Sequence, residues 1–352
     1  MKAIIVAPIL LALALLLLPA CGPQPALPTR AAPALFPPTP PVLPPTPTTA
    51  GATTTVNTPA PTSLPVAPVA EPPLATADAA TPLPLPSGEA AAAVPTGVWP
   101  IASPTPCATP GRVEAGELAS AVAGQSMRYR VYLPPCYGED GRVYPTLYLF
   151  GGNIHDETFW DRLGFDEAAE AAIVAGRIPP LLIVMPDNGW LANTTSSGPT
   201  SYEGFVLNEL IPHIESQTCA WPAREGRAVG GVSRGGYWSL MMAFRRPDLF
   251  RSVGAHSPAL IDSFAGPDED PRVTGTANPL GDLRIWVDIG ERDPYLTAAR
   301  PLHDTLTAAG VAHEWRVNPG IHDEAYWTAH LDDYITWYAA GFPADRAALP
   351  GC

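Results

Sequence analysis

Residues 227–236 read Arg-Ala-Val-Gly-Gly-Val-Ser-Arg-Gly-Gly and predict a strand, a sharp turn and the start of a helix. Residues 228–232 are apolar, as in a buried strand, and residues 235–246 are spaced as in a helix. Between them lies the pattern G-x-S-x-G, in which the glycines beside Ser233 remove the side-chain clashes of a strained turn. A tight turn with an inert serine is the alternative. The strand–turn–helix context favours a nucleophilic Ser233 raised from the edge of a sheet.

The rest of the C-terminal part alternates in the same way between short apolar segments and longer helical ones. Strands are predicted at residues 127–133, 146–150, 181–185, 227–232, 251–256, 284–289 and 313–317. Helices are predicted at residues 165–175, 202–216, 235–246, 294–309 and 325–340. This alternation predicts an α/β fold with a mostly parallel, doubly wound sheet, whose chemistry lies at the carboxyl ends of the strands.

A serine nucleophile needs a base that is held by a third group, and for this fold the chain order is serine, acid, histidine. Downstream of Ser233, Asp293 lies in a loop after a predicted strand, and His322 lies in the loop after the last strand. The rival residues fall inside helices or strands or earlier in the turn: His213, His303, His313, His330, Asp288 and Glu291. Asp323 fits a charge at a helix N-terminus. The order therefore predicts a triad of Ser233, Asp293 and His322.

Several further segments carry a pattern that is more specific than the pentapeptide. They are Tyr144-Pro-Thr-Leu-Tyr-Leu-Phe-Gly-Gly152 with Trp160, Val184-Met-Pro-Asp187, Asn208-Glu-Leu-Ile-Pro-His-Ile-Glu215 and Gly230-Gly-Val-Ser-Arg-Gly-Gly236. From residue 131 to residue 338 the chain resembles the putative esterase family of α/β-hydrolases. That family includes S-formylglutathione hydrolases, enterochelin, feruloyl and acetylxylan esterases and mycolyltransferases. The resemblance implies an α/β-hydrolase fold and the same three residues as the triad.

The chain departs from that family at the loop after residue 150. Family members often carry His-Gly there, and Gly151 stands where the histidine is common. The backbone donor that matters follows Gly152, so the oxyanion hole is predicted to consist of the N–H groups of Asn153 and Arg234. The departure bears on the rigidity of the loop and not on the type of reaction.

Three tryptophans lie near predicted loop ends or in the helix after Ser233, and they are candidates for the walls of an acyl or aromatic pocket: Trp160, Trp190 and Trp238. Core packing is the alternative for each of them. His155 and His256 are candidates for the rim of the cleft and are equally well explained as ordinary loop histidines. Asp187 fits a turn residue.

These residues predict the hydrolysis of a small-molecule or polysaccharide-linked carboxylic ester through an acyl-enzyme, and this chemistry implies no metal and no organic cofactor. One alternative is an acyltransferase of the same fold, which passes the acyl group to a sugar hydroxyl. A second is a surface binding module without catalysis. The substrate is not specified, because the loops expected to set specificity, residues 188–200 and 261–280, predict no fixed shape.

The N-terminus predicts export. Lys2 precedes an apolar run from residue 3 to residue 18, which is short for a membrane-spanning helix and fits a signal peptide over residues 1–20. Leu18-Pro19-Ala20-Cys21 resembles a bacterial lipobox, which implies acylation of Cys21, a membrane anchor and a place in the cell envelope. A plain secretory signal that is cut near Ala20 is the alternative.

Composition separates the chain into two unlike parts. Of its 46 prolines, 27 lie in the first 110 residues, and that part is almost uncharged. Residues 21–109 therefore predict a disordered Pro/Thr/Ala-rich tether, and residues 110–352 the hydrolase domain. The domain carries 18 basic and 31 acidic side chains, a formal charge of −13 that does not favour nucleic acid as a partner. For an exported protein, Cys107, Cys136, Cys219 and Cys352 suggest disulfides with the pairing open, and buried thiols are the alternative.

Overall fold

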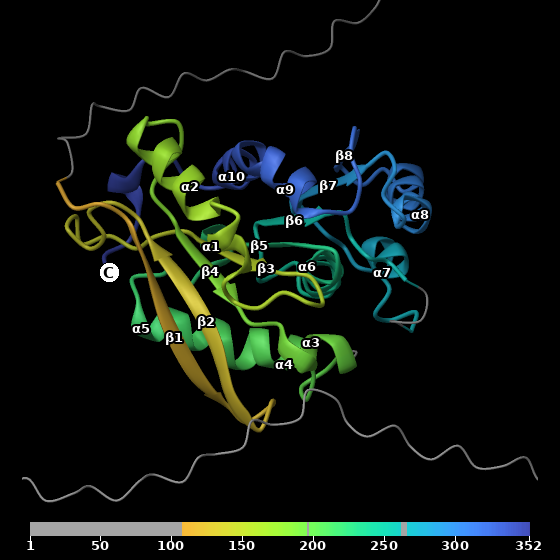
Figure 1. Ribbon diagram of the computed structural model, residues 1–352, viewed down its shortest axis with the longest axis horizontal. Helices are drawn as coiled ribbons and strands as arrows, with labels where there is room; N and C mark the ends of the chain where they lie inside the picture. Colours follow the sequence, from red (N-terminus) through yellow and green to blue (C-terminus); the bar gives the residue numbers. More distant parts are fainter. Residues whose placement is uncertain (1–107, 196, 262–265) are drawn as a thin grey trace, which may run out of the picture. The chain divides into compact units, whose positions relative to one another are not determined.

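The computed structural model describes residues 108–195, 197–261 and 266–352. The predicted signal peptide, Cys21, residues 22–107 of the predicted tether and Cys107 lie outside this part of the chain. The described residues form a sheet of eight strands in the order β1-β2-β4-β3-β5-β6-β7-β8 (Figure 1). The predicted α/β class is confirmed: from β4 to β8 all neighbours are parallel, and β1–β2 and β2–β4 are antiparallel.

The central strands are short and buried on both faces, as expected for parallel strands with helices on either side. The strands are β1 (Arg112–Ser120), β2 (Gln125–Leu133), β3 (Thr146–Phe150), β4 (Leu182–Pro186), β5 (Arg227–Val232), β6 (Ser252–His256), β7 (Arg284–Gly290) and β8 (Glu314–Asn318). Strand β1 was not predicted. It lies at the edge of the sheet and leaves much of its length exposed.

Helices cover both faces of the sheet (Figure 1). They are α1 (Phe159–Arg162), α2 (Phe165–Val174), α3 (Gly189–Thr194), α4 (Tyr202–Phe205), α5 (Ile211–Gln217), α6 (Arg234–Arg245), α7 (Pro271–Ala277), α8 (Leu296–Ala308), α9 (Glu324–Ala329) and α10 (Leu331–Ala339). Helices α4, α5, α6 and α8 share one apolar core, and α1, α2, α9 and α10 share a second. The sheet therefore separates two cores, and the loops at the carboxyl ends of its strands carry Ser233, Asp293 and His322.

Two of the predicted helices are interrupted. The helix predicted at residues 202–216 consists of α4, a π-helical turn (Val206–Leu210) and α5. The helix predicted at residues 325–340 divides at His330 into α9 and α10. The two loops that were expected to set specificity each contain a short helix, α3 and α7. Two single turns of 3₁₀ helix are also present in the described residues, at Arg224–Gly226 and Arg346–Ala348.

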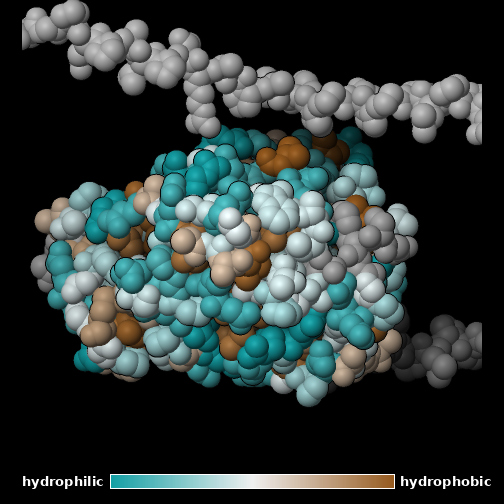
Figure 2. Space-filling view, turned by 90° about the horizontal axis from the view of Figure 1, so that it is seen from below, coloured by the Kyte–Doolittle hydropathy of each residue, from teal (hydrophilic) through white to brown (hydrophobic). Residues whose placement is uncertain are grey.

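The face shown in Figure 2 is largely polar. On this face, hydrophobic residues form small separate patches among hydrophilic ones. Arginine–carboxylate pairs are frequent at the surface, as in Arg162–Glu324 and Arg346–Asp140. Across the three described ranges, no helix has both the length and the apolarity that a membrane crossing requires.

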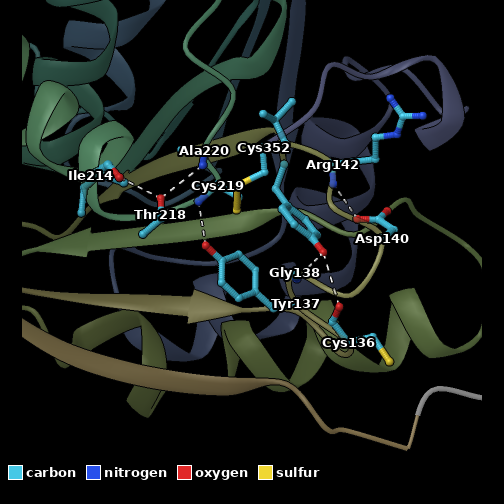
Figure 3. Close-up of a disulfide and its surroundings, with 12 residues drawn as sticks. Cys136, Tyr137, Gly138, Asp140, Arg142, Ile214, Thr218, Cys219, Ala220 and Cys352 are labelled. Atoms are coloured by element: carbon cyan, nitrogen blue, oxygen red, sulfur yellow. Dashed lines mark hydrogen bonds between the residues drawn. A yellow bond between two sulfur atoms is a disulfide. The ribbon is translucent and has the colours of Figure 1, made fainter.

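A disulfide joins Cys219, just after α5, to Cys352 at the end of the chain, 133 residues away in sequence (Figure 3). This bond resolves part of the pairing that the sequence left open. The surrounding backbone is tied as well: Cys219 N–H donates to Tyr137 Oη at 2.7 Å, and Cys352 N–H donates to the Gly141 carbonyl at 2.8 Å. The disulfide therefore joins the C-terminal segment to the segment after α5, and the two hydrogen bonds hold both segments against the loop that leads into β3.

Replacement of Cys352 by serine should lower the free energy of unfolding by about 2–4 kcal/mol, because the unfolded chain loses a long covalent loop. Denaturant titration at 25 °C measures this loss. Cys219→Ser and the double variant should lose the same amount, since each of the three removes the same bond. A double variant that loses roughly the sum of the two single losses would contradict this assignment.

Candidate active site

Ser233 occupies a strained turn between β5 and α6, with φ 55° and ψ −117°. Its N–H donates to the His256 carbonyl at 3.0 Å, and its carbonyl accepts from Ala259 N–H at 3.0 Å. A Cβ at Gly231 or at Gly235 would lie 2.6 Å from the Phe150 carbonyl oxygen, so both positions require glycine. The turn is therefore stabilised by main-chain contacts with β3 and with the end of β6.

His322 and Asp293 meet in the loops that follow β8 and β7. His322 Nδ1 lies 2.8 Å from Asp293 Oδ2, and the second oxygen of Asp293 accepts from Tyr295 N–H at 2.8 Å. The Asp293 side chain is inaccessible to solvent, whereas 18% of the His322 side chain is exposed. Because Nδ1 bonds to the carboxylate, Nε2 is the ring nitrogen that this contact leaves available to accept a proton.

Ser233 and His322 line one cavity of about 250 Å³, together with residues 152–155, Asp323, Glu324 and Trp327. Within the described part of the chain, no hydrogen bond joins the two catalytic candidates directly, and such contacts often tighten only when substrate binds. Asp323 accepts from Tyr326 N–H and caps α9, as the sequence predicted. No group of three or more His, Cys, Asp or Glu side chains among the described residues is arranged to hold a metal ion.

The loop after β3 is held by side-chain amides from the neighbouring segment. Asn188 Nδ2 donates to the Gly151 and Gly152 carbonyls at 2.5 and 3.3 Å, and Asn193 Nδ2 donates to the Asn153 carbonyl at 2.6 Å. Asn188 is fully buried, and its own carbonyl accepts from Tyr202 Oη. Sequence reasoning did not identify Asn188 or Asn193, because nothing local in the sequence links residues 37 or 40 positions apart.

His155 fills the space that a side chain at Gly151 would occupy, since a Cβ at Gly151 would lie 2.7 Å from His155 Cβ. The ring stacks on Phe159 with centroids 3.7 Å apart, and its Nδ1 accepts from Gly152 N–H at 2.9 Å. Burial lowers the pKa of His155 to about 4, so the ring is neutral near pH 7. The expected place of His155 beside the cleft agrees with the cavity lining, and the ring also supports the loop.

Two of the three tryptophans that were considered for the pocket are core residues instead. The Trp160 indole N–H donates to the Phe150 carbonyl and that of Trp238 to the Ala192 carbonyl, and both rings are almost completely buried. Trp190 on α3 is 50% exposed and does not line the cavity.

The tryptophan that lines the cavity is Trp327, whose ring contacts the His322 ring with centroids 5.2 Å apart. His256 is also fully buried and does not reach the rim.

Acidification should show the effect of the half-buried, neutral His155 on the free energy of unfolding. Below the ordinary histidine pKa of about 6.5 the unfolded chain binds a proton that the folded chain does not bind until about pH 4. His155 therefore reduces stability as the pH falls from 7 to 4. Urea titrations should show a steeper loss for the wild type than for His155→Gln, which retains an acceptor for Gly152 N–H. Parallel pH dependences in the two proteins would contradict the shifted pKa.

Comparison with known proteins places this geometry in a family. The family described as "Putative esterase" matches residues 120–338. An esterase of Mycobacterium tuberculosis is 29% identical over 252 residues, which cover 58% of this chain and 54% of that protein. The chain thus spans about half the length of this curated relative.

Solved structures share the fold. A ferulic acid esterase has a TM-score of 0.61 at 23% identity and covers 66% of this chain and all of that one. A ferulic acid esterase of Anaeromyces mucronatus in complex with ferulic acid has a TM-score of 0.50 at 25% identity and covers 64% of this chain and 90% of that one. The predicted α/β-hydrolase fold is confirmed, and the chain belongs to the Putative esterase family.

Proposed function

We propose that this protein is a serine esterase that hydrolyses carboxylic esters through an acyl-enzyme, with Ser233, His322 and Asp293 as its triad. The observation that carries the proposal is the opening of Ser233 and His322 into one cavity, with the buried Asp293 carboxylate on the far nitrogen of His322. A nucleophile, a base and a group that orients the base are the three parts that acyl transfer requires.

In the first half of the reaction, His322 Nε2 takes the proton of Ser233 as Oγ attacks the ester carbonyl carbon. The tetrahedral intermediate then collapses, the C–O bond to the alcohol breaks, and the protonated His322 returns its proton to the departing oxygen. Water, deprotonated by the same His322, attacks the acyl carbon; the bond to Ser233 Oγ then breaks, His322 returns the proton to that oxygen, and the acid is released. Asp293 fixes the His322 tautomer and stabilises the charged ring each time it forms.

Two backbone N–H groups stabilise the negative charge that develops on the substrate oxygen. Arg234 N–H is the first of α6, where the helix dipole favours an anion. Asn153 N–H donates to no other described residue, and its loop is held by the amides of Asn188 and Asn193. The Arg234 side chain turns away and donates to the Ala192 carbonyl, so the main chain of this residue serves the oxyanion hole.

An aromatic acyl group is the substrate feature that the cavity supports best. Trp327 and His155 form a wall of the cavity, and Phe159 stacks behind His155. One structural neighbour was solved with ferulic acid, a planar aromatic acid. Flat aromatic faces in a cleft favour planar groups through offset or edge-to-face contacts. We infer that esters of such planar aromatic acids are among the substrates.

The full chain should hydrolyse p-nitrophenyl acetate and methyl ferulate, and Ser233→Ala should lower kcat by at least about 10⁴-fold because the nucleophile is lost. Ser239→Ala is the matched control: Ser239 lies six residues further along the chain, inside α6, is also buried and donates to the Gly235 carbonyl. It should keep near wild-type kcat. Equal activity in Ser233→Ala and the wild type would refute the proposed nucleophile.

The sequence also supports export and a lipid anchor on Cys21 in the bacterial cell envelope, and we propose both for a protein whose predicted tether is long and almost uncharged. Radiolabelled palmitate should label the wild type in cells and should not label Cys21→Ser. A wild type that stays unlabelled where a known lipoprotein is labelled would argue for a secreted protein instead.

A further inference from the structure

A buried carboxylate lies in the middle of β7, outside the cavity and unused by the proposed reaction. Asp288 is inaccessible to solvent and accepts three hydrogen bonds, from His256 Nδ1 at 2.6 Å, Tyr326 Oη at 2.7 Å and Tyr334 Oη at 3.0 Å. A buried acidic side chain is retained in a protein when its hydrogen-bonding capacity is satisfied, as it is here. These partners come from β6, α9 and α10, so Asp288 connects three elements.

Tyr326 ties this carboxylate to the loop that carries His322. Its hydroxyl donates to Asp288 and accepts from Asn318 Nδ2 at 3.0 Å. Asn318 ends β8 and Tyr326 lies in the first turn of α9, so the two residues enclose the segment that contains His322. The Tyr326 ring also packs on Gly320 so closely that a Cβ there would overlap with it. Burial raises the pKa of Tyr326, which keeps its hydroxyl protonated as a donor.

The main chain of β6 and β7, the strands that carry His256 and Asp288, also contacts the turn of the proposed nucleophile. The His256 carbonyl accepts from Ser233 N–H at 3.0 Å, and the Asp288 carbonyl accepts from Ser257 N–H at 2.7 Å. Ser233 and Ser257 both have positive φ, at 55° and 50°. Asp288 is therefore connected to the strained turn of Ser233 through His256, and to the loop of His322 through Tyr326.

We propose that Tyr326, through its hydrogen bond to Asp288, is a positioning residue that sets the location of His322 relative to Ser233. This inference rests on the proposed function, because it assigns His322 the role of base. Loss of the hydroxyl removes the side-chain link from Asp288 to residues 319–322, which then keep the main-chain bond from Arg292 N–H to the Gly320 carbonyl and the bond from His322 to Asp293. The base then samples positions away from the nucleophile, which slows proton transfer and changes substrate binding little.

The test compares the two tyrosine hydroxyls, of Tyr326 and Tyr334, that donate to the same carboxylate oxygen of Asp288. Tyr326→Phe and Tyr334→Phe each remove one buried donor from Asp288 Oδ2. Tyr334 lies on α10, stacks on His256 and has no hydrogen bond to the His322 loop among the described residues. Tyr326→Phe should lower kcat about 10- to 100-fold with KM within about twofold, as expected for a displaced catalytic group. Tyr334→Phe should keep kcat within about twofold.

The full chain is assayed with methyl ferulate, and the rate of Ser233 labelling by a fluorophosphonate is measured alongside. Labelling needs only the nucleophile and its base, so it tests the inference even if the ester is a poor substrate. Asn318→Ala, which removes the other hydrogen bond of the Tyr326 hydroxyl, should show the same selective loss of kcat and serves if Tyr326→Phe does not fold. Equal kcat and labelling rates in Tyr326→Phe and Tyr334→Phe would overturn the positioning role and leave the esterase proposal intact. A wild type that is neither active nor labelled would overturn both.

Discussion

The close approach of backbone to backbone around Ser233 is the constraint on which the rest of the site depends. Glycines at 231 and 235 let the turn contact the Phe150 carbonyl, and the His256 carbonyl accepts the Ser233 N–H. Positive φ at a serine is costly, so it persists only where the surroundings impose it. Here three parallel strands, β3, β5 and β6, impose it together, and each of them must keep its register for the turn to hold.

The sheet register also brings Asp293 and His322, the proposed acid and base, together. β7 and β8 pair so that Gly290 is opposite Asn318, and a Cβ at Gly290 would lie 2.7 Å from the Gly320 carbonyl oxygen. The loops after the two strands are thus in contact from their first residues, and Arg292 N–H donates to that same carbonyl. The short distance between Asp293 and His322 follows from strand pairing, although the residues are 29 positions apart in sequence.

These relations explain what the sequence could and could not predict. The alternation of strand and helix segments suffices for the class of fold, and the chain order of serine, acid and histidine suffices to place Ser233, Asp293 and His322 in loops after strands. Strand β1 was missed because it is an exposed edge strand with a weak apolar pattern. Trp160 and Trp238 were ambiguous because helical spacing does not tell a core ring from a pocket ring; their buried N–H groups bond to carbonyls within the core.

The departure at Gly151 shows how one function of a loop can be carried by other residues. A histidine at this position would meet His155, which occupies the space and accepts the Gly152 N–H. Asn188 and Asn193 then satisfy the three carbonyls of residues 151–153. An oxyanion hole contributes to catalysis only if its donors are fixed before the charge develops. The side chains of His155, Asn188 and Asn193 therefore hold this loop. A comparison with the family at position 151 alone does not reveal them.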